Sequence, residues 1–239
     1  MARRKDGYLR GSVCANAAVS WTGGKDSSLS LHEAEMSGCR INCLVTFAPS
    51  QERFLAHPLG LMRLQAQAMD LPHYVIAVEE PYERGYEKVI SSLREEHGID
   101  TLVTGDISEI AGHDTNWMAD RTARCSVNLL RPLWHRDRLD LLNRLLTLRF
   151  RAVFSCVKRP WFTEDWLGLE LSWSSIARLR ELSRKTGLDV CGEQGEYHTL
   201  VLDAPRFRKS ISMSSYSKHT DGSVMYISPE NLRLEEKVT

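Results

Sequence analysis

The chain lacks several features that would assign it to a special class of protein. No apolar run approaches the roughly 20 residues of a membrane-spanning helix, and the basic residues near its start are not followed by the apolar segment of a signal peptide. Lys and Arg together number 31, as do Asp and Glu, so the net charge gives no reason to expect a nucleic acid or a membrane as partner. We therefore expect a cytoplasmic protein that binds neither.

Cysteine is sparse and irregularly spaced. The six residues form no C-x-x-C pair and lie scattered through apolar segments, which favours buried, reduced thiols over a disulfide framework or a zinc site. The chain also has no Pro- or Gly-rich linker, no low-complexity tract and no internal repeat. With 239 residues, 42% of them hydrophobic, it is long enough for one large domain or two closely packed smaller ones.

The most informative stretch is residues 19–28, which read Val-Ser-Trp-Thr-Gly-Gly-Lys-Asp-Ser-Ser. An apolar segment typical of a β-strand runs directly into two glycines, a cation, an acid and two hydroxyls. Glycines let backbone N–H groups close on an anion, Lys25 adds a point charge, and Ser27 and Ser28 can donate where the following helix points its positive end. The pattern predicts a phosphate-binding loop, although two glycines by themselves would also suit a tight turn.

Asp26 gives this loop a second property. A carboxylate repels phosphate unless a divalent cation lies between them, so the loop also predicts Mg²⁺, with Asp26 as the metal ligand. The loop differs from the G-x-x-x-x-G-K-[ST] motif of nucleoside triphosphatases, because an acid rather than a hydroxyl follows Gly24 and Lys25.

Short apolar runs then alternate with helical patterns, which is typical of a doubly wound, mostly parallel α/β sheet. In such a sheet ligands bind beyond the carboxyl ends of the strands, so we expect the glycine loop and the Gly105-Asp106 turn to face a common cleft. By the same topology Ser20, Trp21 and Phe47 are expected to flank adenine and ribose. The expected strands are residues 17–21, 41–47, 73–78 and 101–105, and the expected helices are residues 26–36, 59–69, 82–97 and 138–148.

The pattern changes beyond about residue 149. A strand at 153–157, a helix at 174–186, a strand at 197–202 and a hairpin of strands 211–216 and 223–227 predict a smaller α+β lobe. We therefore expect a flexible lead-in over residues 1–14, an ATP-binding domain over 15–148 and a substrate-binding lobe over 149–239.

Two segments carry a resemblance to known proteins. Residues 22–27 resemble the S-G-G-x-D-S signature of the PP-loop, or N-type, ATP pyrophosphatases, with Thr22 in place of the first serine. Residues 192–205 read Gly-Glu-Gln-Gly-Glu-Tyr-His-Thr-Leu-Val-Leu-Asp-Ala-Pro and are similar to the G-E-G-G-E-[YF]-E-T-L-V-L-D-A-P stretch of the diphthine ammonia ligase family. The order and separation of the two segments also match this family, so the resemblance spans most of the chain.

The resemblance implies a fold like that of the adenine nucleotide alpha hydrolases and a specific chemistry. In the family, ATP is split to AMP and pyrophosphate as a substrate carboxylate becomes adenylated, and ammonia then displaces AMP. The carboxylate belongs to a modified histidine, diphthine, of translation elongation factor 2, which becomes diphthamide. No glutaminase domain is recognisable in the chain, which is consistent with ammonium as the nitrogen source.

These arguments assign roles to particular residues. The expected catalytic residues are Lys25, Asp26 and Glu196, of which Glu196 would bind ammonium or accept its proton. The expected nucleotide-binding residues are Ser20, Trp21, Thr22, Gly23, Gly24, Lys25, Asp26, Ser27, Ser28, Phe47, Gly105 and Asp106. The expected substrate-binding residues are Glu193, Glu196, His198, Arg121 and Arg124.

Several alternatives stay open at this point. Gln194 replaces a glycine of the family pattern and His198 replaces an acid, which puts the identity of the acyl substrate in question. Arg121 and Arg124 are also consistent with solvated charges on a helix. Other functions that the sequence allows are a different PP-loop enzyme, acting on tRNA or on a small amide-forming substrate, and an ATP-binding sensor without turnover. A homo-oligomer is also compatible with the sequence.

Overall fold

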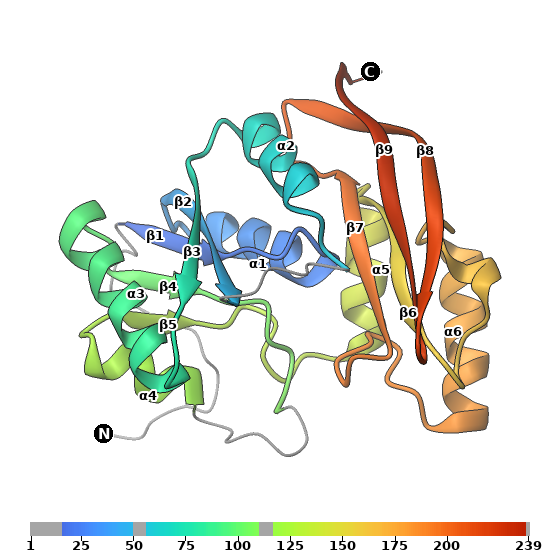
Figure 1. The fold of residues 1–239 in the computed structure, drawn as a ribbon, viewed down its shortest axis with the longest axis horizontal. Coiled ribbons are helices and arrows are strands. Elements are labelled where there is room, and N and C mark those ends of the chain that lie inside the picture. The colour runs from blue at the N-terminus through green and yellow to red at the C-terminus, as the bar shows by residue number, and fades with distance from the viewer. Residues whose placement is uncertain (1–15, 50–55, 110–116, 238–239) are drawn as a thin grey trace.

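The computed structural model describes residues 16–49, 56–109 and 117–237, which form two adjoining lobes (Figure 1). The first lobe is built on a five-stranded, all-parallel sheet with the strand order β3-β2-β1-β4-β5. The expected lead-in over 1–14 lies outside the described residues. The strands and helices of this lobe are β1 (Ala17–Ser20), α1 (Lys25–Met36), β2 (Ile41–Pro49), α2 (Leu59–Met69), β3 (His73–Val78), α3 (Tyr82–His97), β4 (Thr101–Val103), α4 (Trp117–Arg124) and β5 (Asn128–Leu130).

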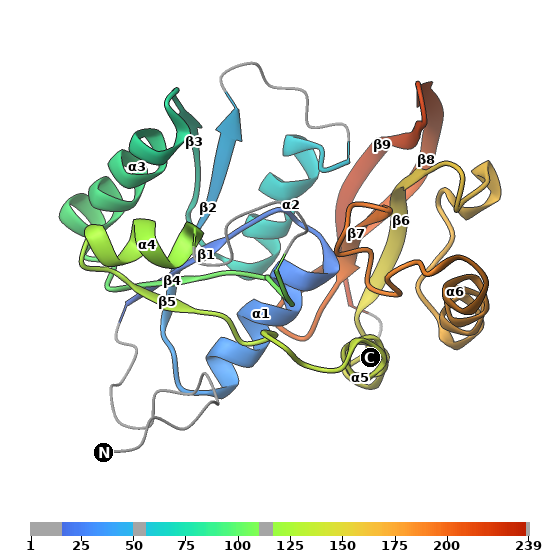
Figure 2. The same ribbon diagram turned by 90° about the horizontal axis from the view of Figure 1, so that it is seen from below.

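Helices cover both faces of this sheet. Ala17 and Val19 of β1 point into a core that includes residues of α1 and α2, whereas Ala18 between them packs with residues of α3. This alternation follows from the two-residue period of a strand. Figure 2 shows α1 and α2 on the side of the sheet toward the second lobe and α3 with α4 on the other side. The predicted doubly wound α/β fold is therefore confirmed.

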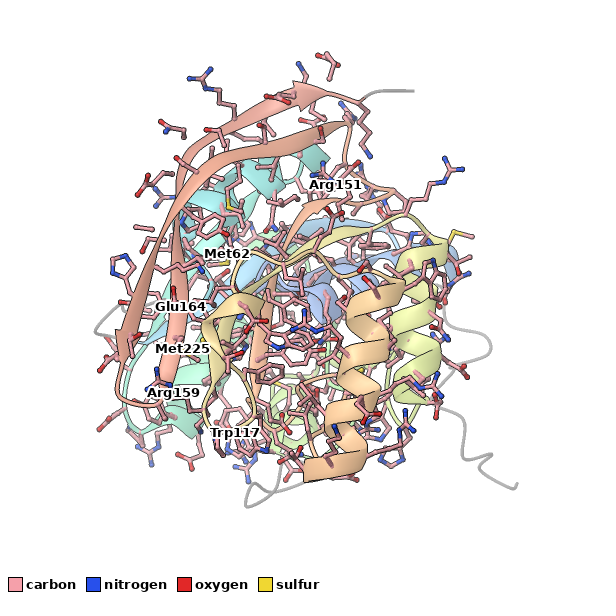
Figure 3. The ribbon with its side chains drawn as sticks, turned by 90° about the vertical axis from the view of Figure 1, so that its right-hand side faces the viewer. Met62, Trp117, Arg151, Arg159, Glu164 and Met225 are labelled. Carbon is pink, nitrogen blue, oxygen red and sulfur yellow. The ribbon has the colours of Figure 1, made fainter. Side chains whose placement is uncertain are left out.

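The second lobe is α+β, as predicted. Its antiparallel sheet has the strand order β7-β6-β9-β8. Figure 3 looks onto this lobe and shows α5 and α6 next to each other, away from the long β8–β9 hairpin. The elements that follow β5 along the chain are α5 (Arg138–Thr147), β6 (Arg151–Lys158), the 3-10 helix η1 (Glu164–Trp166), α6 (Trp173–Thr186), β7 (Tyr197–Asp203), β8 (Lys209–Asp221) and β9 (Val224–Glu236).

The expected element boundaries agree with the structure to within two residues, except in the C-terminal hairpin. The strands of the C-terminal hairpin are 13 residues long each, more than twice the predicted lengths. Residues 217–221 and 228–236 are mostly polar and are exposed or half-buried, so no apolar pattern marks the second half of either strand in the sequence. In the first lobe β4 ends at Val103, two residues before the predicted end, so Gly105 lies in the loop that follows the strand.

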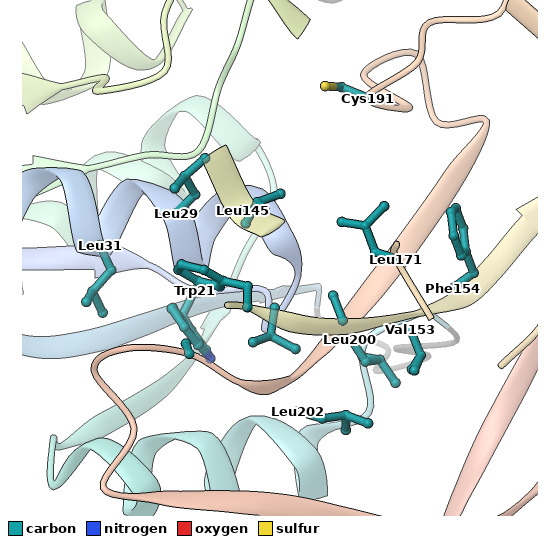
Figure 4. Packing of buried hydrophobic residues seen from close by; sticks show 14 of the residues in the cluster. Trp21, Leu29, Leu31, Leu145, Val153, Phe154, Leu171, Cys191, Leu200 and Leu202 are labelled. Carbon is teal, nitrogen blue, oxygen red and sulfur yellow. The ribbon is translucent and has the colours of Figure 1, made fainter. Parts of the chain in front are cut away.

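The two lobes share one hydrophobic core. A single cluster of buried side chains runs from β1, α1 and α2 through α5 to the strands of the second sheet. Figure 4 shows part of it, with Leu29 of α1 and Leu145 of α5 on the side of Trp21 and Leu200 of β7 beside Val153 of β6. The lobes therefore pack as one body. Among the described residues there is no helix with the length and apolar character needed to cross a membrane.

Candidate active site

A cavity of about 440 Å³ lies where the two lobes meet. Three segments that are distant in sequence line it: the glycine loop after β1, the turn after β4, and the segment that leads into β7. The structure thus brings the predicted loop and the predicted turn to one cleft and adds the second sequence motif from the other lobe. The lining residues are Ser20, Thr22, Gly24, Lys25, Asp26, Ser27, His57, Thr104, Gly105, Asp106, Met118, Gly192, Glu193, Gln194, Gly195, Tyr197, His198 and Thr199.

The backbone conformation and the packing of the loop explain why residue 23 is a glycine. Gly23 has a φ of +74°, and a Cβ on it would lie 2.5 Å from Oε1 of Gln65, so no other residue fits without a shift. Gly24 is the N-cap residue of α1 and makes no side-chain hydrogen bond to the helix. The first turn of α1 therefore presents its positive end to the cavity, which suits a phosphate group.

Lys25 is held in place by the second lobe. Its backbone N–H donates to Oγ1 of Thr199 over 3.0 Å, and its buried Nζ donates to Oδ2 of Asp26 over 2.7 Å and to the carbonyl of Cys191 over 2.5 Å. Nζ also lies 5.1 Å from the centre of the Tyr197 ring. Burial acts to lower the pKa of Lys25, but Asp26, Tyr197 and Cys191 together outweigh it and raise this pKa above its ordinary value. Lys25 is therefore a fixed cation at the base of the cavity.

Two carboxylates on neighbouring loops have the oxygen donors that Mg²⁺ prefers. The side chain of Asp26 is 31% exposed and lines the cavity. Asp106 lines it from the turn after β4, where its Oδ2 accepts a hydrogen bond from Oγ1 of Thr104 over 2.8 Å. Magnesium is commonly bound by one or two carboxylates together with substrate phosphates, so these residues fit the ion. Within the described ranges no group of three or more His, Cys, Asp or Glu side chains is arranged to hold a metal.

Glu193 is the carboxylate of the second lobe that faces the cavity. Its Oε1 accepts hydrogen bonds from the backbone N–H groups of Ile107 and Ser108, over 3.0 and 3.4 Å. The pKa of Glu193 is raised to about 7, chiefly by burial and also by the nearby Asp26 carboxylate, although the two backbone hydrogen bonds oppose the rise. A group that gains and loses a proton near neutral pH is suited to general acid or base catalysis.

Glu196 has a different place from the one we expected. Its buried carboxylate accepts from the backbone N–H of Asp189 through Oε1 and from the backbone N–H of Gln194 through Oε2, over 3.0 and 2.9 Å. Glu196 is not among the residues that line the cavity. A tight loop leaves N–H groups without backbone partners, and this side chain satisfies two of them. Its position supports a role in shaping the loop that presents Glu193.

Gln65 of α2 is a residue that the motifs did not single out. Its Oε1 accepts from Nε1 of Trp21 over 3.0 Å, and its Nε2 donates to the carbonyls of Gly23 and Val201 over 2.9 and 2.8 Å. It therefore connects the glycine loop to β7. The sequence does contain a signal for it, because it is a polar residue on the apolar face of α2, which is formed by Leu61, Met62, Ala66 and Met69.

A smaller hollow of about 180 Å³ adjoins the cavity and shares Ser20, Thr22, His57 and Met118 with it. Phe47, which was expected near adenine, lines this hollow and stacks on Tyr86 with ring centres 4.7 Å apart. Trp21 also contributes to the lining, but its side chain is only 1% exposed and belongs to the core. The indole therefore supports the loop from beneath.

The remaining predicted residues divide into two groups. His198 lines the cavity and lies against His57. Arg121 and Arg124 do not line it, because both point to Glu87 of α3, at 3.1 and 3.7 Å. The exposed Arg124 fits the alternative of a solvated charge on a helix, whereas Arg121 is buried and its charge is paired with Glu87. Ser28 is buried within α1 and does not line the cavity either.

Comparison with known proteins gives one consistent result. The family model described as "Diphthamide synthase N-terminal domain" matches residues 15–122, and the one described as "Diphthamide synthase C-terminal domain" matches residues 137–232. The chain is 28% identical to the diphthine–ammonia ligase of Mus musculus and 26% identical to that of Homo sapiens, in each case over 91% of this chain and 92% of the relative.

Among solved structures, a predicted subunit of a tRNA methyltransferase from Methanocaldococcus jannaschii is 16% identical, with a TM-score of 0.46, over 80% of this chain and 98% of that one. A score at this level supports no inference about function. The two family models, by contrast, match successive parts of the chain in the order of its two lobes. The chain belongs to the diphthamide synthase family of ATP-dependent amide ligases.

Proposed function

We propose that this protein adenylates the carboxylate of diphthine on translation elongation factor 2 with ATP and then amidates it with ammonia. The observation that carries the proposal is the shared cavity, in which the glycine loop of one lobe faces Glu193 of the other. Adenylation needs a site for phosphates and amidation needs a proton acceptor, and both lie within one space. The proposal implies a cytoplasmic location, because elongation factors act there.

Nucleotide binding is assigned to the first lobe. The end of α1 beside Gly24 suits the phosphates, and the hollow at Phe47 suits the base. Asp26 and Asp106 would hold Mg²⁺, which when bound supplies positive charge beside the phosphate oxygens. Lys25 and the backbone N–H groups of the loop are fixed before the reaction, so they stabilise the charge that develops on the leaving pyrophosphate.

Amidation is assigned to the second lobe. Ammonium must lose a proton before its nitrogen can attack the acyl carbon of the adenylate. The ionised Glu193 carboxylate accepts that proton, the C–N bond forms, and the bond between the acyl carbon and the AMP oxygen breaks. The second proton that the nitrogen loses on becoming an amide passes to solvent. A pKa of about 7 leaves a large part of Glu193 ionised at neutral pH.

The test is a product assay with elongation factor 2 that carries diphthine. With ATP, Mg²⁺ and ammonium, the account predicts AMP and pyrophosphate in equal amounts and a carboxamide on the elongation factor. ADP as the product would overturn the proposal. Bound ATP without any turnover would instead indicate a sensor.

A matched pair of variants makes the assay specific to the cavity. Asp26→Asn removes one charge from the metal site and is expected to lower turnover at least about 100-fold, in the range seen when a key electrostatic group is lost. Asp221→Asn makes the same change at the exposed end of β8 and is expected to leave turnover unchanged.

A further inference from the structure

Two histidines lie together on the wall of the cavity. His57 precedes α2 and His198 belongs to β7, and their rings meet edge to face with centres 5.1 Å apart. His57 lies beside the N-cap of α1, since its Cε1 is 3.3 Å from the position that a Cβ on Gly24 would occupy. Its Nδ1 is buried and has no hydrogen-bond partner in the part of the chain that the structure describes.

Both imidazoles are neutral in the protein without ligand. Burial lowers the pKa of His57 to about 3, with further contributions from His198 and Lys25. Burial, with a further contribution from Lys25, lowers the pKa of His198 to about 4. At neutral pH the pair therefore adds no charge to the cavity.

None of the other ionisable groups that line the cavity supplies an uncompensated positive charge for a bound anion. Lys25 and Asp26 of α1 compensate each other in their 2.7 Å ion pair. Asp106 and Glu193 are acids, and Tyr197 is neutral because burial raises its pKa. An anion at the end of α1 therefore meets a partly buried site that contains two imidazoles able to take up a proton.

We propose that His57 and His198 form an anion-binding pair that takes up a proton from solvent when the triphosphate of ATP binds, and then donates a hydrogen bond to a phosphate oxygen. This inference rests on the proposed function in one respect, namely that a nucleotide binds at the glycine loop. It adds to that function two residues and a coupling between nucleotide binding and protonation.

The negative charge of a bound phosphate is large enough to protonate an imidazole of this pair. One negative charge about 4 Å away, at an effective dielectric constant of about 20, raises an imidazole pKa by about 3. This moves His198 from about 4 to about 7, so the pair is protonated in the complex and neutral in the free protein at pH 6. By linkage, the proton should strengthen nucleotide binding about tenfold at pH 6 and hardly at all at pH 8.

The test is calorimetry with the nonhydrolysable nucleotide α,β-methylene ATP and Mg²⁺. Titrations at pH 6 in two buffers of different ionisation enthalpy give the number of protons taken up on binding. We expect the wild type to take up about half to one proton more than the variant that carries both His57→Gln and His198→Gln. We also expect the wild type to bind about tenfold more tightly than this variant at pH 6, and equally tightly at pH 8.

The control is His219→Gln, which makes the same change on the exposed part of β8 and should behave as the wild type. Each single variant is also measured, so that the test survives if the double variant fails a thermal unfolding check. If the wild type and the folded variants take up equal numbers of protons and bind with equal affinity at pH 6, the proposal that His57 and His198 form a proton-accepting pair is wrong. Failure of the wild type itself to bind the nucleotide would overturn the proposed function instead.

Discussion

Glu193 and Glu196 carry the same carboxyl group three residues apart, and the backbone gives them opposite surroundings. Glu193 faces the cavity and is close to half ionised at neutral pH. Glu196 lies behind the loop and accepts hydrogen bonds from two of its N–H groups. Catalysis and loop structure are therefore assigned to different acids of one motif, and each assignment can be tested.

Glu193→Gln should lower the rate of amide formation at least about 100-fold, because a carboxamide cannot accept the proton of ammonium. The effect should depend on pH, since the wild-type carboxylate works only when it is ionised. At a fixed concentration of total ammonium the wild-type rate should rise with pH and level off above about 7, where Glu193 is ionised. The variant has to use free ammonia, whose concentration keeps rising with pH, so its rate should rise over the whole range without levelling off. The measurement is carboxamide formation at fixed total ammonium over pH 6–8, and a variant whose pH profile levels off like that of the wild type would contradict the assignment.

Glu196→Gln should act on stability. The amide group of glutamine can replace only one of the two acceptor oxygens, so one buried N–H loses its partner, at a cost of about 1–3 kcal/mol in the free energy of unfolding. Denaturant unfolding measures this, with the exposed Glu230→Gln as a control that should change nothing. Wild-type stability together with lost turnover would favour the catalytic role that we first expected for Glu196.

At the residue scale, the residues of the glycine loop could be predicted from the sequence, but the residues that hold the loop in place could not. Gly23 and Lys25 can be predicted because a short run of adjacent residues contains the whole chemical pattern. Gln65 and Thr199 could not be predicted as partners of that loop, because their contacts join residues more than 40 and 170 positions apart. Such contacts depend on how the lobes pack, which a local pattern does not encode.

At the scale of elements, α2 and β7 fix the position of the glycine loop. Gln65 of α2 donates to the loop at Gly23 and to β7 at Val201, and the backbone N–H of Val201 donates to Gly23 as well. The loop thus connects two lobes and is not merely a turn of the first. Any displacement of β7 would therefore move the glycine loop at the start of α1.

Gln65→Leu should therefore weaken both the fold and nucleotide binding. The change leaves Nε1 of Trp21 and the carbonyl of Val201 without this partner, which should lower the free energy of unfolding by about 2–5 kcal/mol. The Michaelis constant for ATP should rise more than the turnover number falls, because the loop is displaced while the catalytic groups remain. Gln67→Leu, on the exposed face of the same helix, is the control for both measurements. An unchanged Michaelis constant in a folded Gln65→Leu protein would count against the positioning role.

The elements themselves could be predicted to different extents. Strands and helices of the first lobe follow from buried apolar runs that alternate with amphipathic helices, and α2, β3 and α3 have the expected bounds. The second halves of β8 and β9, residues 217–221 and 228–236, are mostly polar, so only the first half of each strand was predicted. Their length comes from pairing with each other, which is a non-local property.

At the scale of the whole molecule, the lobes are joined by more than the shared core. Arg206 of the second lobe makes an ion pair of 2.8 Å with Glu35 of α1, and Glu193 accepts from Ile107 across the cavity. We expected the lobe boundary at residues 148 and 149, which would place α5 in the first lobe, and this boundary stays a prediction. We propose α5 as a shared element, because it packs in the continuous core.

A continuous core predicts one cooperative unfolding transition for both lobes. Calorimetry should show a single peak, and the far-ultraviolet circular dichroism and tryptophan fluorescence curves should coincide. Trp21 reports on the interface of the lobes and Trp166 on the second lobe. Two resolved transitions would contradict the description of the lobes as one body.

The central claim is that the glycine loop holds ATP so that a carboxylate attacks its innermost phosphorus. The most direct measurement follows the oxygen of that carboxylate. Elongation factor 2 with ¹⁸O in the carboxyl group of diphthine is incubated with the protein, ATP, Mg²⁺ and ammonium, and the products are analysed by mass spectrometry. The account predicts one ¹⁸O atom in the phosphate of each AMP formed. Label in inorganic phosphate, or AMP without label, would contradict it.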